Sequence, residues 1–145
     1  MRKLNLKAIK LEYIRKRILL ALGMHQSDET AVYSGSRKSE IEDGMASAVY
    51  SALVEIYENF YGAYNLEVPF IDEKCDDSFE VLLEPASLEA LVCLGASKLC
   101  TEEEASLYTR LLYKYKDLCE SAFEVNTDKK SRNSFFAMSE KRGMF

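Results

Sequence analysis

The sequence is poor in the residues that most often bind metals or build disulfide frameworks. Its 145 residues include one histidine, His25, and four cysteines. A structural zinc site needs four convergent cysteine or histidine ligands, which usually enter in closely spaced pairs. No CxxC pair occurs here, and the two cysteines on one predicted helix lie about 10 Å apart along its axis, beyond the reach of a disulfide. We therefore expect four reduced thiols without a metal or redox role: Cys75 and, in or near the core, Cys93, Cys100 and Cys119.

Long apolar runs are also missing. No stretch approaches the roughly 18 apolar residues that span a membrane. Residues 1–24 are not a signal peptide, because charged residues recur between Lys7 and Arg17 and leave no apolar central region. This amphipathic stretch has neither Trp nor Phe, so packing within a protein explains it better than a membrane surface does. We expect the mature protein to start near Met1, in the cytoplasm, and to have no membrane partner.

Catalytic signatures are absent as well. The sequence offers no nucleophile–base pair in reach, no glycine-rich phosphate loop and no cluster of metal ligands. The acidic stretch at residues 72–77, DEKCDD, resembles a cation-binding loop in composition only, because it lacks the glycine that an EF-hand loop needs. His25 has no second histidine or cysteine nearby and is expected in an exposed loop. The sequence thus predicts a protein that is not an enzyme and needs no cofactor.

Length and composition predict one globular domain with a hydrophobic core, because 48% of the 145 residues are apolar. The net charge of −5 hides a strong segregation: residues 1–17 carry +6 and residues 126–145 carry +3, which leaves −14 for residues 18–125. Such a field repels nucleic acid from the body and offers basic ends to an acidic partner, although a well-solvated helical surface has the same pattern. Acidic neighbours also favour a core role over base stacking for one aromatic cluster: Tyr57, Phe60, Tyr61 and Tyr64.

The clearest structural signal is a helical hairpin over residues 84–123. Pro85 suits the first turn of a helix, and Gly95 lies in a notch of small residues that would let another backbone approach. Thr101 and Glu104 form a capping-box pattern that ends one helix and begins the next. The second helix carries an apolar seam at alternating steps of three and four, which we expect to be buried: Ala105, Tyr108, Leu112, Tyr115, Cys119 and Ala122.

Two further helices are predicted before this hairpin. The first covers residues 4–22, with this apolar stripe on one face: Leu4, Ala8, Leu11, Ile14, Ile18 and Leu22. The second is capped by Ser39 and runs to about residue 61, with this buried face: Ile41, Met45, Val49, Ala52, Leu53, Ile56 and Phe60. Residues 64–71 and 78–84 predict either a short hairpin or an extended excursion, and Pro69 confines the first of them to an edge.

After Phe123 the periodic pattern stops. Residues 124–145 are polar and basic with isolated aromatic side chains, which is typical of a segment that orders on a partner, and equally of a merely disordered terminus. We therefore divide the chain into a helical domain, residues 1–125, and a C-terminal arm, residues 126–145. The arm is expected to carry the partner-binding residues: Lys129, Lys130, Arg132, Phe135, Phe136, Met138, Met144 and Phe145.

The sequence as a whole predicts a mainly α fold: a four-helix bundle-like domain, a short β-hairpin or extended excursion between helices two and three, and a flexible C-terminal arm. The chain resembles the head–tail adaptor (connector, neck) proteins of tailed bacteriophages. The resemblance is carried by LKAIKLEYIRKRILLALGM, MASAVYSALVEIYENF and EPASLEALVCLGASKLCTEEEASLYTRLLYKYKDLCESAF, and it covers most of residues 4–123. In that family a helix like EALxxLxAxxLC leads through a short acidic break to a helix like YxRxxxxY. The excursion here is shorter than the β-rich segment of many relatives.

The resemblance implies a structural virion protein of the phage neck, without catalysis. Such proteins form a ring, usually of twelve copies, beneath the portal protein and next to tail or stopper proteins. DNA passes through the ring without sequence-specific binding, and an acidic wall fits such a channel because it repels phosphate. The arm would insert into the portal. The protein would lie in the host cytoplasm before assembly and in the virion afterwards.

A second hypothesis is a small cytoplasmic helical module, with a regulatory or interaction role, that binds a partner through its basic ends. The neighbouring genes separate the two hypotheses. A portal, capsid or terminase gene beside this one favours the phage neck, whereas a lone operon favours the module. An enzyme is a distant third.

Overall fold

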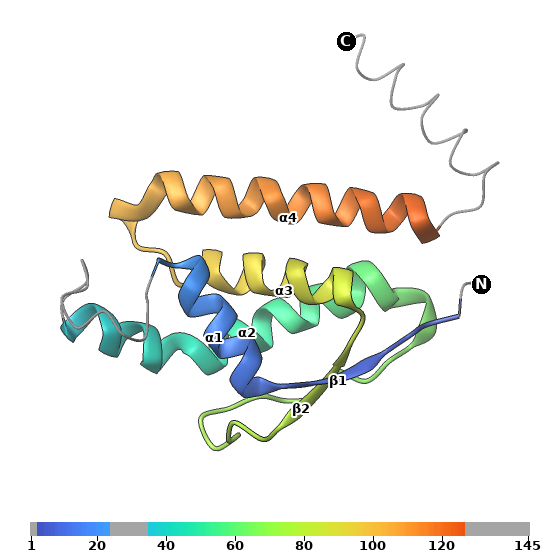
Figure 1. Cartoon of the computed structure of the whole chain (residues 1–145), viewed down its shortest axis with the longest axis horizontal. Coiled ribbons are helices and arrows are strands. Elements are labelled where there is room, and N and C mark those ends of the chain that lie inside the picture. The colour runs from blue at the N-terminus through green and yellow to red at the C-terminus, as the bar shows by residue number, and fades with distance from the viewer. Residues whose placement is uncertain (1–2, 24–34, 127–145) are drawn as a thin grey trace, which may run out of the picture.

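Helices form most of the chain that the structure describes. The computed structural model describes residues 3–23 and 35–126, and Figure 1 shows their arrangement. The helices are α1 (Leu11–Ala21), α2 (Gly35–Tyr61), α3 (Pro85–Lys98) and α4 (Ala105–Asn126), and the strands are β1 (Lys7–Lys10) and β2 (Glu80–Leu83). Two 3₁₀ turns, Gly62–Tyr64 and Glu102–Glu104, follow α2 and precede α4. The predicted mainly α fold, with an extended excursion between α2 and α3, is confirmed.

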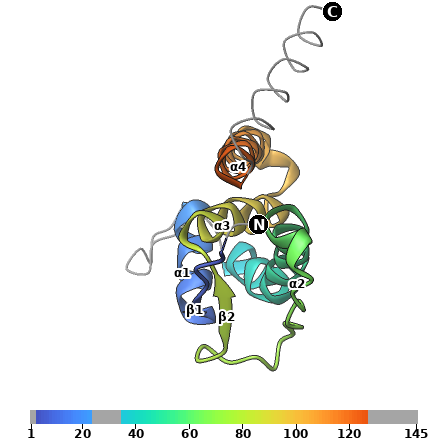
Figure 2. The ribbon, with the colours of Figure 1, turned by 90° about the vertical axis from the view of Figure 1, so that its right-hand side faces the viewer.

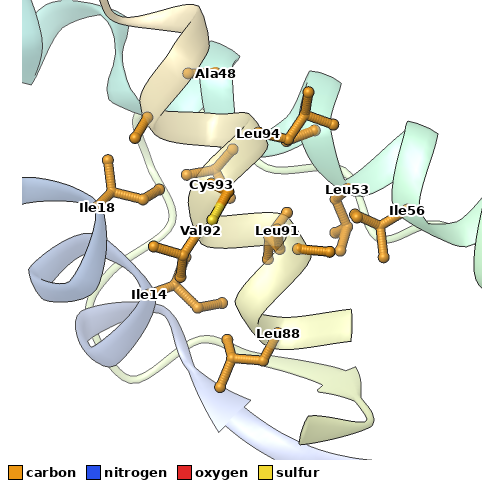
Figure 3. Close-up of a cluster of buried hydrophobic side chains, with 14 of the residues drawn as sticks. Ile14, Ile18, Ala48, Leu53, Ile56, Leu88, Leu91, Val92, Cys93 and Leu94 are labelled. Atoms are coloured by element: carbon orange, nitrogen blue, oxygen red, sulfur yellow. The ribbon is translucent and has the colours of Figure 1, made fainter. Parts of the chain in front are cut away.

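α3 is the central helix of the fold. It lies between α4 and α2 in two perpendicular views, and α1 packs against it as well (Figures 1 and 2). Its sequence is apolar around the whole circumference, and all residues from Ala90 to Ser97 are buried. A helix that is apolar on all sides belongs in the interior. In Figure 3, Leu91 and Val92 of α3 lie within a cluster of buried side chains that α1 and α2 complete.

The boundaries of α3 and α4 follow the capping signals in the sequence. Pro85 is the first residue of α3. Beyond its end, the Thr101 N–H donates to Glu104 Oε1 at 2.9 Å, which confirms the capping box before α4. The same carboxylate oxygen accepts a hydrogen bond from Arg37 of α2 at 2.6 Å. The predicted helical hairpin is confirmed, and an ion pair from α2 holds its turn in place.

The segment before α1 is a strand rather than the start of a helix. The sequence predicts one helix over residues 4–22, but the first part of it is β1. Contacts to a distant loop explain the boundary: the Leu11 N–H donates to Phe79 O at 2.7 Å, and the Glu12 N–H donates to Asp77 O at 3.2 Å. Two amides that lack partners at a helix N-terminus are satisfied in this way. The predicted boundary was wrong because these partners are far away in the sequence.

β2 pairs with β1 and not with residues 64–71. The two strands are antiparallel, with Ile9 opposite Val81. The hairpin between residues 64–71 and 78–84 is therefore wrong, and the alternative, an extended excursion, is right. Pairing with β1 suits the alternation of β2, because Val81 and Leu83 enter the core while Glu80 and Leu82 stay exposed.

α2 begins earlier than predicted but buries the predicted face. It starts at Gly35 rather than at Ser39 and ends at Tyr61. Arg37 lies in this additional turn, and its ion pair with Glu104 stabilises the extension. All seven predicted face residues are buried: Ile41, Met45, Val49, Ala52, Leu53, Ile56 and Phe60.

Two glycines let the neighbouring helices approach closely. A Cβ atom on Gly95 of α3 would lie 3.0 Å from Ile18 Cδ1 of α1. A Cβ atom on Gly44 of α2 would lie 3.1 Å from Leu99 Cδ2. The predicted notch at Gly95 therefore receives a side chain, and not a second backbone.

α4 is the peripheral helix, and its buried seam differs from the predicted one. Leu111 and Tyr115 are buried, whereas Tyr108 is 44% exposed and Ala105 is exposed too. Half-buried residues flank this seam: Leu107, Leu112, Leu118 and Cys119. α4 packs mainly against one helix, α3, so only a narrow stripe is covered. The side chain of Ala122 lies outside the described residues.

Candidate partner-binding surfaces

The partner-binding residues predicted from the sequence lie outside the described residues. All eight belong to residues 127–145: Lys129, Lys130, Arg132, Phe135, Phe136, Met138, Met144 and Phe145. Their role, and the division between a helical domain and an arm at residue 125, stay predictions. His25 also lies outside the described ranges. The surfaces of the described body are therefore the ones that geometry can assess.

The cysteines of the described body lie apart from one another and are at least partly buried. Among residues 3–23 and 35–126, no group of three or more His, Cys, Asp or Glu side chains is arranged to hold a metal ion. The helices of those ranges are too short or too polar to cross a bilayer. Cys93 is buried and Cys100 and Cys119 are half-buried, which confirms their predicted place in or near the core. Burial raises the pKa of these three thiols and so keeps them protonated.

The basic N-terminal region is only partly available to a partner. Arg15 donates to Asp77 Oδ1 at 2.7 Å and to Cys75 O at 3.0 Å, which holds the acidic loop of the excursion against α1. Arg17 donates to Glu89 Oε1 of α3 at 2.5 Å, and this hydrogen bond raises the pKa of its guanidinium. Both arginines therefore serve packing within the chain. Among the described residues of this region, the exposed cations are lysines: Lys3, Lys7, Lys10 and Lys16.

The outward face of α1 combines apolar side chains with one of these lysines. Leu11, Ile14 and Ile18 are buried on the inward face. On the outward face, Tyr13 is 46% exposed and Leu20 is 53% exposed. Lys16 lies between them at helical spacing and forms an ion pair with Glu12 at 3.1 Å on the same helix. We call Tyr13, Lys16 and Leu20 the α1 stripe.

A second surface is a groove between α2 and residues 70–74, which we call the α2 groove. Its volume is about 410 Å³. Ala46 and Tyr50 of α2, together with Phe70 and Ile71, supply its apolar lining. The rings of Tyr50 and Phe70 meet edge to face with centroids 5.0 Å apart, although Phe70 remains 64% exposed. The polar lining is mainly acidic: Asp43, Ser47, Asp72, Glu73 and Lys74. Sequence reasoning missed this groove.

The aromatic cluster at the end of α2 has the predicted core role. Tyr57, Phe60 and Tyr61 are buried, and Tyr64 is half-buried. The Tyr57 hydroxyl donates to Leu82 O of β2 at 2.8 Å. The Tyr61 hydroxyl accepts from the Glu84 N–H at 2.9 Å, where α3 begins. These hydroxyls satisfy backbone groups at the junction of β2 and α3, so they serve the fold and do not form a stacking platform.

Tyr115 joins α4 to α2 and makes stability sensitive to alkaline pH. Asn59 Nδ2 donates to Tyr115 Oη at 2.8 Å. Burial raises the pKa of Tyr115, and burial also raises the pKa of Tyr57. In the unfolded chain a phenol ionises near its ordinary value of 10.0. The folded state holds these protons to higher pH, so the stabilisation is complete below about pH 10 and is lost as the pH rises above it.

We expect the free energy of unfolding, measured with urea, to fall between pH 9.5 and 11. Tyr115→Phe removes one of the two buried phenol groups whose ionisation causes this fall, so the free energy of unfolding should fall less steeply with pH in this variant. The matched control is Tyr113→Phe, because Tyr113 is on the same helix and 69% exposed. Equal slopes in both variants would contradict the assignment of the pH dependence to Tyr115.

Comparisons with family models, with curated proteins and with solved structures found no match to this chain.

Proposed function

We propose that this chain is a structural assembly protein of a tailed-phage neck, which forms a ring between the portal and the tail. The observation that carries the proposal is the position of α4. This helix lies on the outer side of α3 and buries only a narrow stripe (Figures 1 and 2). The basic, aromatic residues that follow Asn126 are therefore joined to the periphery of the body, where attachment to another protein does not disturb the core.

Charge supports the same proposal. The arm carries +3, and residues 18–125 carry −14. A basic arm suits docking on an acidic partner surface, and an acidic body avoids trapping the phosphates of passing DNA. The ring would then guide DNA without sequence-specific binding. In this proposal the portal and the tail or stopper proteins are the partners, and the virion is the final location.

The competing proposal, a small interaction module, differs in stoichiometry. A module forms a complex with one or two copies of its partner, whereas a neck protein repeats around an axis. The apolar faces of the helices are mostly used within one chain, and the exposed apolar residues are isolated or in small groups. We therefore expect a monomer or weak oligomer in isolation, because stable interfaces bury larger apolar areas.

Light scattering of the purified chain tests this expectation. The mass should be that of a monomer or weak oligomer at micromolar concentration. It should rise to that of a many-copy assembly when the portal protein encoded in the same genome is added. A stable dodecamer without the portal contradicts the first part, and a complex of one or two chains with a partner supports the module instead.

A further inference from the structure

The α2 groove and the α1 stripe are complementary in chemistry. The groove combines an apolar lining from Tyr50, Phe70 and Ile71 with three carboxylates and one ammonium group. The α1 stripe presents Leu20 and the ring of Tyr13, whose hydroxyl accepts a hydrogen bond from Arg17 at 3.1 Å, with Lys16 between them. The exposed Lys7 and Lys10 precede the stripe on β1. Two apolar anchors two helical turns apart, with a charged side chain between them, match the way in which an amphipathic helix occupies a groove.

The two surfaces lie on different sides of the molecule. α1 and α2 pack against different flanks of α3, as Figure 2 shows. The α1 stripe therefore does not fill the groove of its own chain. A contact between them joins two copies head to tail and leaves one stripe and one groove free at the ends. Contacts of this kind generate rings when the rotation closes.

We propose that the α1 stripe of one copy docks in the α2 groove of a second copy. Tyr13 and Leu20 contact the apolar lining, and Lys16 lies against the acidic rim formed by Asp43 and Glu73. The proposal rests on the ring proposed above and names the contact between its neighbours. Charges at the rim contribute mainly to specificity and association rate, so a single contact is weak and salt-sensitive. Repetition around a ring makes the assembly firm.

Sedimentation velocity of the full chain at low salt, at concentrations up to the millimolar range, tests this contact. Two variants remove one side each: Asp43→Lys with Glu73→Lys in the groove, and Lys16→Glu with Leu20→Glu in the stripe. All four residues lie at the surface, so both variants are expected to fold, which circular dichroism checks. Each should weaken self-association about tenfold or more, because like charges then face each other. In a mixture of the two variants the intact stripe meets the intact groove, and the reversed stripe meets the reversed groove with opposite charges, so the mixture should regain the self-association that each variant alone has lost.

The matched controls place two substitutions each on α4, and they change the net charge in the same direction as the variants that they match. Lys114→Glu with Lys116→Glu, and Asp117→Lys with Glu120→Lys, should associate as the original chain does, because these exposed residues lie away from both surfaces. A chain ending at residue 126 should also keep its self-association. Loss of association in that chain would assign the groove to the C-terminal arm and overturn the proposal.

Two other results overturn it: an original chain that stays monomeric at all concentrations, and a mixture of the variants that stays monomeric while the original chain associates. The proposed function is judged separately. If the groove variant still forms rings on the portal, the contact proposed here is wrong and the neck function stands. If the original chain forms no ring on the portal, the neck function is wrong.

Discussion

Removal of residues 128–145 is expected to leave the melting temperature nearly unchanged and to abolish binding to the portal protein. The buried core of the described body extends from Leu11 to Tyr115, so the truncation removes none of it. Burial of Phe135, Phe136 and Met138 in a partner would contribute about 4–8 kcal/mol before the cost of ordering the arm, which cancels much of it. Differential scanning calorimetry and a pull-down with the portal encoded in the same genome give the two readouts.

A full-length control separates the arm's side chains from its length. Phe135→Ala with Phe136→Ala should reproduce the loss of binding, whereas Ser131→Ala with Asn133→Ala should bind as the original chain does. A fall in melting temperature of more than about 5 °C on truncation, which corresponds to about 1 kcal/mol, would place the arm in the core and refute its assignment.

The second large effect is expected in α3. Leu91→Ala should lower the free energy of unfolding by about 2–5 kcal/mol, because it leaves a cavity in the helix that all the others pack against. Leu91 has no exposed surface and lies beside Leu53 and Ile56 of α2 (Figure 3). Such a loss is a large part of the total stability of a domain, which is typically about 5–15 kcal/mol. Urea unfolding followed by circular dichroism measures it.

The matched control is Leu82→Ala on β2. Its side chain is 50% exposed, so the same substitution should change the free energy of unfolding by less than about 0.5 kcal/mol. Similar losses for Leu82→Ala and Leu91→Ala would contradict the central position of α3.

The elements that sequence could predict are those with local signals. Pro85 and the Thr101–Glu104 capping box mark helix ends within a few residues, and the face of α2 follows from its period. β1 was missed because residues 4–22 keep a helical period throughout, and the partners that make Leu11 the first helical residue come from the distant loop at residues 77–79. Tertiary hydrogen bonds overrode the local pattern.

The seam of α4 shows the same limit in packing. Tyr108 and Leu111 belong to two overlapping stripes, each with steps of three and four. The position of α3 decides which of the two stripes is buried, and the sequence of α4 alone does not indicate that position. The α2 groove was missed for a similar reason, since its lining comes from α2 and from the excursion, which meet only in the fold.

Electron microscopy of the full chain mixed with the portal protein encoded in the same genome tests the central claim most directly. The account predicts a closed ring of many copies, coaxial with the portal and with an open channel. The chain ending at residue 127 should give bare portals in the same preparation. Bare portals with the full-length chain, or isolated copies bound without a ring, would contradict the claim.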